Sequence, residues 1–279
     1  MRCGGHRRGD GDRASRWPAS PRGAARSERH KLIISAVSKS SRTVEELAAL
    51  TGASAVTIRR DLADLAERDA LRRVRGGAAP AKSRGATYPF DLRSTERPAT
   101  KQALARAVAS MINPGDSVLI DNGTTALAVA HELTGLGITA LALLLHAAVV
   151  LAAKPGNQVI VPGGPVNHDD LSFTASGTAD VIRRMRFDIA IIGSCAAHPD
   201  AGLTVADWGD AHVKRAALES ASRVCLATTA DKFTQTAAHQ FATYADLDTL
   251  VTTTDASPSA LAEARLAGVE VLTVESPPD

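Results

Sequence analysis

Apolar residues recur at helical spacing in three consecutive segments near the start of the chain. The first predicted helix spans residues 28–38. The second begins after Thr43, which stands three residues before Glu46 and forms a capping box with it, and ends at the turn residue Gly52. The third is predicted over residues 54–68, and its core-facing stripe consists of Ile58, Leu62 and Leu65. Two helices joined at a glycine turn are typical of a helix-turn-helix.

From about residue 100 onward, buried strands alternate with amphipathic helices. The predicted helices are 101–111, 123–133, 175–185, 211–220 and 259–267. The predicted strands are 117–121, 158–161, 187–192, 223–228 and 249–252. Gly137 and His146 interrupt the longest apolar run, Leu136 to Ala153, which we therefore interpret as a buried strand leading into a helix and not as a membrane span. Strands separated by helices favour a mainly parallel sheet covered on both faces.

Proline-rich and glycine-rich segments divide the chain into parts. Pro80, Pro89 and Pro98 mark a linker. The predicted fold class is a small α/β winged helix-turn-helix domain followed by an α/β domain with a mainly parallel sheet. The predicted parts are a disordered basic tail (1–27), the winged domain (28–79, with its helix-turn-helix at about 44–63), the linker (80–100), the larger domain (101–255), and a C-terminal helix and tail (256–279).

The net charge of +2 conceals a strong asymmetry along the chain. Residues 1–84 hold 19 Lys and Arg against 9 Asp and Glu, which gives +10, whereas residues 85–279 hold 13 against 21, which gives −8. A basic first third on an acidic body indicates a nucleic-acid-binding module. The 3 cysteines form no C-x-x-C pair, so we expect a protein of the reducing cytoplasm with no disulfide framework, metal site or cofactor.

The third predicted helix has a polar face that suits DNA. A recognition helix enters the major groove with its N-terminal residues at the base edges, where Arg binds guanine or phosphate. The segment 71–74 is compatible with a strand, and the glycines after it permit the turn of a wing. The candidate DNA-binding residues are Ser54, Ala55, Thr57, Arg59 and Arg60 on the helix, and Arg72, Arg73 and Arg75 on the wing.

These residues resemble a known family. The runs SAVTIRRDL at 54–62 and LRRVRGGA at 71–78 look like the DeoR-type winged helix-turn-helix, with Ala53 and Arg75 where that family commonly has Val and His. The resemblance continues over residues 89–255 to a sensor domain similar to ribose-5-phosphate isomerase. It implies a transcriptional repressor of sugar-metabolism genes that binds a double-stranded DNA operator and responds to a phosphorylated sugar.

A strand end followed by a helix start forms the candidate effector site. Asp121 ends a buried strand, and Gly123, Thr124 and Thr125 open the next helix, whose free N–H groups and dipole favour a phosphate, although the same residues also suit ordinary helix capping. Asp121 suits a sugar hydroxyl. The resemblance implies four further effector-binding residues, which are Gly163, Gly164, Lys214 and Lys232.

The segment after the second strand departs from that family. Leu143 to Leu145 stand where the family usually has Thr-Asn-Ser, and leucine cannot donate a hydrogen bond to a phosphosugar. His146 then either takes over this role or is a core histidine. If His146 does not take over the role, the effector differs from the family's or is sensed more weakly.

Two other functions remain open at this point. A sugar-phosphate isomerase with a DNA-binding extension needs a carboxylate base, and residues 194–198, which follow Gly193, contain none. A regulator that responds to a protein partner is the third interpretation. We also expect a homo-oligomer, a dimer or a tetramer, because one winged module offers few base contacts and paired modules match paired half-sites.

Overall fold

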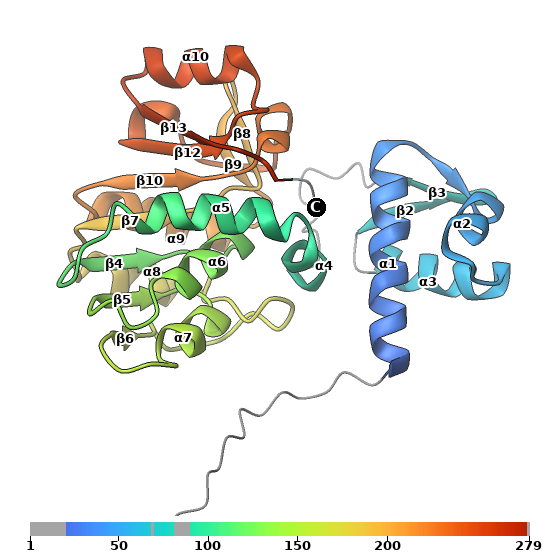
Figure 1. Cartoon of the computed structure of the whole chain (residues 1–279), viewed down its shortest axis with the longest axis horizontal. Coiled ribbons are helices and arrows are strands. Elements are labelled where there is room, and N and C mark those ends of the chain that lie inside the picture. Colours follow the sequence, from blue (N-terminus) through green and yellow to red (C-terminus); the bar gives the residue numbers. More distant parts are fainter. Residues whose placement is uncertain (1–20, 68–69, 81–89, 278–279) are drawn as a thin grey trace, which may run out of the picture.

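The computed structural model describes residues 21–67, 70–80 and 90–277. Figure 1 shows a small helical domain with a β-wing and a larger α/β domain. The predicted tail over residues 1–20 lies outside the described residues. Residues 21–27 belong to the first helix, so this part of the predicted tail is wrong.

The small domain consists of three helices and a three-stranded antiparallel sheet in the order β1-β3-β2. Its elements are α1 (Pro21–Lys39), β1 (Arg42–Thr43), α2 (Val44–Thr51), α3 (Ala55–Glu67), β2 (Leu71–Val74) and β3 (Gly77–Pro80). The predicted capping box of Thr43 and Glu46 is present, and Gly52 adopts a φ of 67°. A Cβ on Gly77 would lie 2.0 Å from the carbonyl oxygen of Arg42, so only glycine permits the close pairing of β1 with β3.

The larger domain is built on a parallel sheet of seven strands in the order β13-β12-β10-β7-β4-β5-β6. Its strands are β4 (Ser117–Ile120), β5 (Thr139–Ala142), β6 (Gln158–Ile160), β7 (Ile189–Ile192), β10 (Val224–Ala227), β12 (Thr249–Thr253) and β13 (Glu270–Val274). The chain builds one half of the sheet from β4 to β6 and then crosses to β7. The order therefore reverses between β4 and β7, and in such sheets ligands bind at the carboxyl ends of the strands beside this reversal.

Helices cover both faces of the sheet, as predicted (Figure 1). One face packs against α4 (Phe90–Thr95), α5 (Pro98–Ala109), α6 (Thr124–Glu132) and α7 (Leu145–Leu151). The other packs against α8 (Ser176–Arg183), α9 (Trp208–Ser220) and α10 (Pro258–Leu266). A second antiparallel sheet in the order β11-β9-β8 joins β8 (Ala196–His198), β9 (Gly202–Val205) and β11 (His239–Ala242), and the 3-10 helices are η1 (Ala230–Thr234) and η2 (Tyr244–Asp246).

Two predicted segment boundaries are corrected. The predicted linker 80–100 contains α4 and the start of α5. Pro98 does not break α5, because it lies in the first turn, where a backbone N–H has no hydrogen-bond acceptor within the helix. The predicted C-terminal tail contains β13, which pairs with β12 along five residues. The apolar run Leu136 to Ala153 forms β5 and α7, in agreement with the prediction. Within the described residues, no helix is long and apolar enough to span a membrane.

Candidate functional site

Helix α3 presents the start of its outer face to solvent. Arg59 and Arg60 are exposed, and Val56, which is four residues before Arg60, is 67% exposed. The hydroxyl of Ser54 accepts the N–H of Thr57 at 3.2 Å, and the two hydroxyl oxygens lie 2.9 Å apart. Ser54 therefore caps the helix, as expected, and Thr57 takes part in the cap. The sequence pattern did not identify Val56 as a candidate DNA contact. Its side chain is nevertheless more exposed than those of the two neighbouring residues.

The wing carries the other predicted cations. Arg72, Arg73 and Arg75 are all exposed on the β2–β3 hairpin, whose turn contains Gly76 with a φ of 79°. The hairpin thus carries three exposed arginines on the same small domain as α3, and arginine side chains suit contacts with a phosphate backbone.

Asp61 fixes the orientation of α3. Its carboxylate is buried and accepts hydrogen bonds from Arg29 at 2.6 and 3.2 Å, and it lies 3.0 Å from Nε2 of His30. Both partners belong to α1, so the motif residue Asp61 ties the two helices together. Burial alone would raise the pKa of Asp61, but Arg29 and His30 together lower it. Burial lowers the pKa of His30 below its usual value.

The predicted residue Asp121 lies at the point where the strand order of the large sheet reverses. It follows β4, and its Oδ2 accepts the N–H of Gly193, which follows β7, at 2.7 Å. Its other oxygen, Oδ1, and the hydroxyl of Ser194 are buried without a hydrogen-bond partner among the described residues. Buried polar atoms of this kind need an explanation, and a polar ligand at the carboxyl edge supplies one.

Lys214, one of the predicted effector-binding residues, is buried in an ion-pair network. The residue is 1% exposed, and its ammonium donates a hydrogen bond to Asp121 and lies 3.4 Å from Asp210. Desolvation alone would lower the pKa of Lys214, but the two carboxylates raise it above its usual value. Burial and the charge of Asp121 raise the pKa of Asp210, whose Oδ1 also accepts Asn122 Nδ2 at 2.9 Å. The positive charge of Lys214 is therefore neutralised inside the protein.

The start of α6 retains its free donors. Gly123 is the N-cap and provides no side-chain hydrogen bond, so no side chain in the described part of the protein caps the first N–H groups of the helix. Thr124 and Thr125 are half-buried there. A Cβ on Gly123 would meet no atom within 4 Å, so the space beside its backbone is open. Phosphate binding by Gly123, Thr124 and Thr125 stays a prediction, for which this helix start offers donors and space.

Two lysines approach each other at the same edge. Helix α5 ends just before β4 begins, so it runs antiparallel to the strands and its first turn, with Lys101, lies at their carboxyl ends (Figure 1). Lys232 lies in η1, directly after β10, and its Nζ is 3.2 Å from Asp231. Burial, together with the charges of Arg93 and Lys232, lowers the pKa of Lys101 to about 8. Lys101 is absent from the predicted effector set.

Helix α4 connects this edge to the chain that leads from the small domain. The Lys101 ammonium donates to the carbonyl oxygen of Arg93, and the Arg93 guanidinium lies 5.7 Å from the centre of the Phe90 ring. Phe90 in turn stacks on His146. His146 is exposed, so its interpretation as a core histidine is wrong. At the turn into α5, Arg97 has a φ of 47° and forms an ion pair with Asp231 at 3.1 Å.

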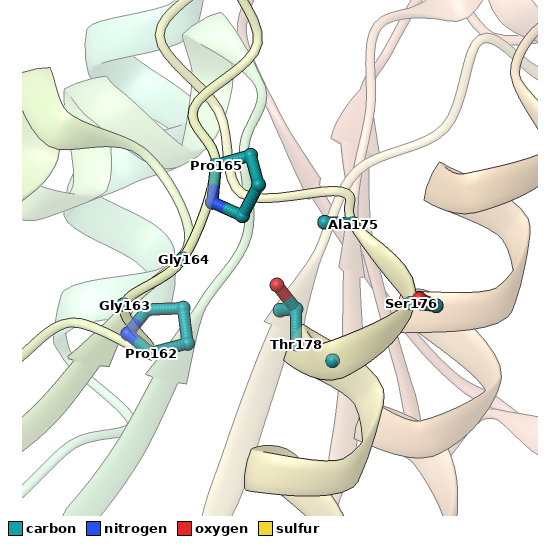
Figure 2. Close-up of a pocket in the computed structure, with 8 residues that line it drawn as sticks. Pro162, Gly163, Gly164, Pro165, Ala175, Ser176 and Thr178 are labelled. Carbon is teal, nitrogen blue, oxygen red and sulfur yellow. The ribbon is translucent and has the colours of Figure 1, made fainter.

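Gly163 and Gly164 belong to a different loop from Asp121. They follow β6 and face the start of α8 across a groove of about 280 Å³ (Figure 2). Two strand spacings of about 4.8 Å separate β6 from β4, so the two strands lie roughly 10 Å apart within the sheet. The predicted effector residues thus fall into two groups.

Comparisons with known proteins cover both domains. A family model described as a DeoR-like helix-turn-helix domain matches residues 29–84, and one described as a DeoR C terminal sensor domain matches residues 96–254. The glycerol-3-phosphate regulon repressor of Escherichia coli (strain K12) is 32% identical over 233 residues, which are 83% of this chain and 91% of the repressor. The repressor of the same name from Haemophilus influenzae is 35% identical over 234 residues, 80% and 88% of the two chains. Ribose 5-phosphate isomerase A from Methanocaldococcus jannaschii is similar over 47% of this chain and 52% of its own, with 14% identity and a TM-score of 0.34.

Proposed function

The chain belongs to the DeoR family of transcriptional regulators, and we propose that α3 reads an operator while a phosphorylated sugar acts on the carboxyl edge of the large sheet. Membership of this family makes the protein a DNA-binding transcriptional regulator and not an isomerase. The relatives named above are repressors, and we propose repression of sugar-metabolism genes for this chain as well. The exposed start of α3, with its two arginines, is the observation that carries the proposal.

In the proposed complex, α3 lies in the major groove. Arg59 and Arg60 reach base edges or phosphates, and the wing arginines bind the phosphate backbone. Asp61 and Arg29 hold α3 in place on α1, which keeps the exposed face directed outward. The basic small domain attracts DNA, whereas the acidic body does not.

Arg60→Ala tests DNA reading. If Arg60 reads a base, the substitution weakens operator binding by about 1–3 kcal/mol and relaxes discrimination against scrambled DNA. Arg73→Ala on the wing is the matched control, for which we expect equal losses on both DNAs and a smaller salt dependence. Gel shifts with the promoter and with scrambled DNA measure both effects. If Arg60→Ala weakens binding to the promoter and to scrambled DNA equally, Arg60 contacts only phosphate. If it weakens neither, Arg60 does not contact DNA.

The proposed effector site lies at the start of α6. The free N–H groups of that helix and the Thr124 and Thr125 hydroxyls accommodate a phosphate, and Lys101 and Lys232 supply positive charge from neighbouring elements. The unpartnered oxygens of Asp121 and Ser194 support a polar ligand beside the two central strands. Lys214 contributes indirectly, because it holds Asp121 in place.

Thr125→Val tests the effector site, since it removes a donor and keeps the shape. We expect calorimetric affinity for the effector to fall tenfold or more, which corresponds to a charge-assisted hydrogen bond of about 1.5–3 kcal/mol. Operator binding by the free protein stays unchanged. Glycerol 3-phosphate is the first ligand to titrate, because two relatives are named for its regulon. Turnover of a bound sugar phosphate would favour the isomerase alternative. Failure of every sugar phosphate to bind would refute this effector class.

We further propose a cytoplasmic dimer or tetramer. A winged domain of about 50 residues makes few base contacts, and symmetric pairs match pseudo-palindromic operators. Light scattering of the free and DNA-bound protein tests this point. A monomer in both states would contradict it.

A further inference from the structure

Strand β6 forms one edge of the large sheet, and Figure 1 shows it at the lower end of the domain. Gln158 donates its N–H to the carbonyl oxygen of Ile138 at 2.9 Å, on the side of β5. Successive residues of a strand direct their backbone groups to opposite sides, so Val159 and Val161 direct theirs away from β5. The N–H of Val161 has no acceptor among the described residues. The edge therefore offers backbone donors and acceptors to a further strand.

The chain around this edge is exposed and uncharged. From Pro155 to Asn167, no side chain is charged and no residue is buried. Val161 is 42% exposed and Val166 is 37% exposed. Exposed edge strands commonly carry charged side chains or proline, which prevent pairing with another chain. Pro162 does not block this edge, because its position in the alternation faces β5 and no outward N–H is lost there.

The opposite edge of the sheet is protected against a second copy. Strand β13 begins at the exposed Glu270, and the exposed Glu275 follows its last residue. Two copies of β13 paired in antiparallel fashion would bring these like charges close together, which is unfavourable. Because β6 carries no such charge, pairing of two copies is disfavoured at β13 and permitted at β6.

The charges that flank the uncharged segment favour a second copy as its partner. Lys154 is exposed before the amino end of β6, and Asp169 is exposed in the loop beyond the carboxyl end. When two copies of one strand pair antiparallel about a twofold axis, the amino end of each meets the carboxyl end of the other. Lys154 then lies toward the partner's Asp169, and the same attraction is repeated on the other side of the axis.

We propose that two copies of the chain associate through β6, which pairs antiparallel with the β6 of the second copy about a twofold axis. The two large sheets then continue into one another, and Val161 and Val166 of both copies are covered. This inference rests on the proposed oligomer and names its surface. An interface of this kind is closed, so it yields a defined pair of subunits, as paired half-sites require.

Sedimentation velocity of the full-length protein tests this surface. Val161→Lys places a cation of each copy near the twofold axis, where the two repel, and Val161→Glu does the same with an anion. We expect each variant to weaken self-association by about tenfold or more and to reduce the assembly to half the wild-type mass. An equal mixture of the two variants reassociates, because opposite charges then face each other. Leu266→Lys on α10, where the side chain is 81% exposed, is the control and keeps the wild-type mass.

The possible failures are distinguishable from one another. A monomeric wild type would overturn both this proposal and the proposed oligomer, and would leave the edge to a different partner. Wild-type mass in both Val161 variants would leave the oligomer standing on another surface and would overturn the β6 contact. Variants that dissociate but do not reassociate when mixed would show that the two copies of residue 161 do not lie together, which refutes the twofold pairing. Neither DNA nor effector is present, so the result is independent of the proposed operator and effector sites.

Discussion

The rings of Phe90 and His146 stack with their centroids 5.3 Å apart and an angle of 11° between their planes. Phe90 is the first described residue after the connection from the small domain, and His146 begins α7 at the carboxyl end of β5. The contact therefore joins the chain entering the large domain to the edge at which we propose that the effector binds. Arg93 lies over the same Phe90 ring and receives a hydrogen bond from Lys101 through its carbonyl oxygen.

Loss of this stack is expected to reduce the coupling between effector and DNA. Aromatic pairs contribute about 0.5–1.5 kcal/mol, so we predict that His146→Ala changes the ratio of operator affinities with and without effector by about two- to tenfold. Fluorescence anisotropy with labelled operator measures both affinities. His146→Phe keeps a ring at the site and serves as the control. An unaltered ratio in His146→Ala would show that the stack has no part in the coupling.

Effector affinity is expected to depend on pH through Lys101. Its pKa of about 8 means that the ammonium loses its proton between pH 7 and 9, whereas a phosphate monoester stays doubly charged over this range. We predict that affinity falls as pH rises through 8, and that binding near pH 8 takes up protons because a bound phosphate raises the pKa of Lys101. Calorimetry in buffers of different ionisation enthalpy detects the uptake. Lys101→Arg, which stays charged, removes the dependence. Constant wild-type affinity from pH 7 to 9 would place Lys101 outside the site.

Asp121 is expected to matter for stability as well as for ligand binding. Asp121→Ala leaves the buried Lys214 with Asp210 as its remaining carboxylate partner. Removing one member of a buried ion pair typically costs about 3–5 kcal/mol, and we predict a loss near the lower value in the free energy of unfolding by urea. The double variant Asp121→Ala, Lys214→Leu recovers part of this loss, because no unpaired charge remains. A single-variant loss below about 1 kcal/mol would contradict the assigned ion pair.

Val56 is expected to contact a thymine methyl group. It is exposed near the start of α3, four residues before Arg60, and apolar side chains read that methyl in the major groove. We predict that replacing one thymine of a selected operator by deoxyuridine weakens wild-type binding by about 0.8 kcal/mol and leaves Val56→Ala binding unchanged. Val149→Ala, an equally exposed change on α7, is the control. If no thymine shows this dependence on Val56, the residue does not read a base.

Local patterns in the sequence determined the helix-turn-helix and the alternating architecture. The capping box of Thr43 and Glu46 and the apolar stripe of α3 depend only on residues within a few positions of one another. The same holds for the turn from β4 into α6, where Gly123 and the threonines follow a buried strand. These features were predictable because their determinants lie inside one element or at one junction.

Tertiary structure decided the features that depend on distant residues. Asp121 and Lys214 are 93 positions apart in the sequence, and only the tertiary structure brings them together as a buried ion pair. Likewise, the pattern placed Ala55 and Thr57 on the outer face of α3, where both are half-buried, and only the packing of the helix shows that Val56 between them is exposed. The short strands β8, β9 and β11 and the edge strand β13 depend on pairing partners. Such pairings are long-range, and a sequence pattern of three to five residues does not specify them.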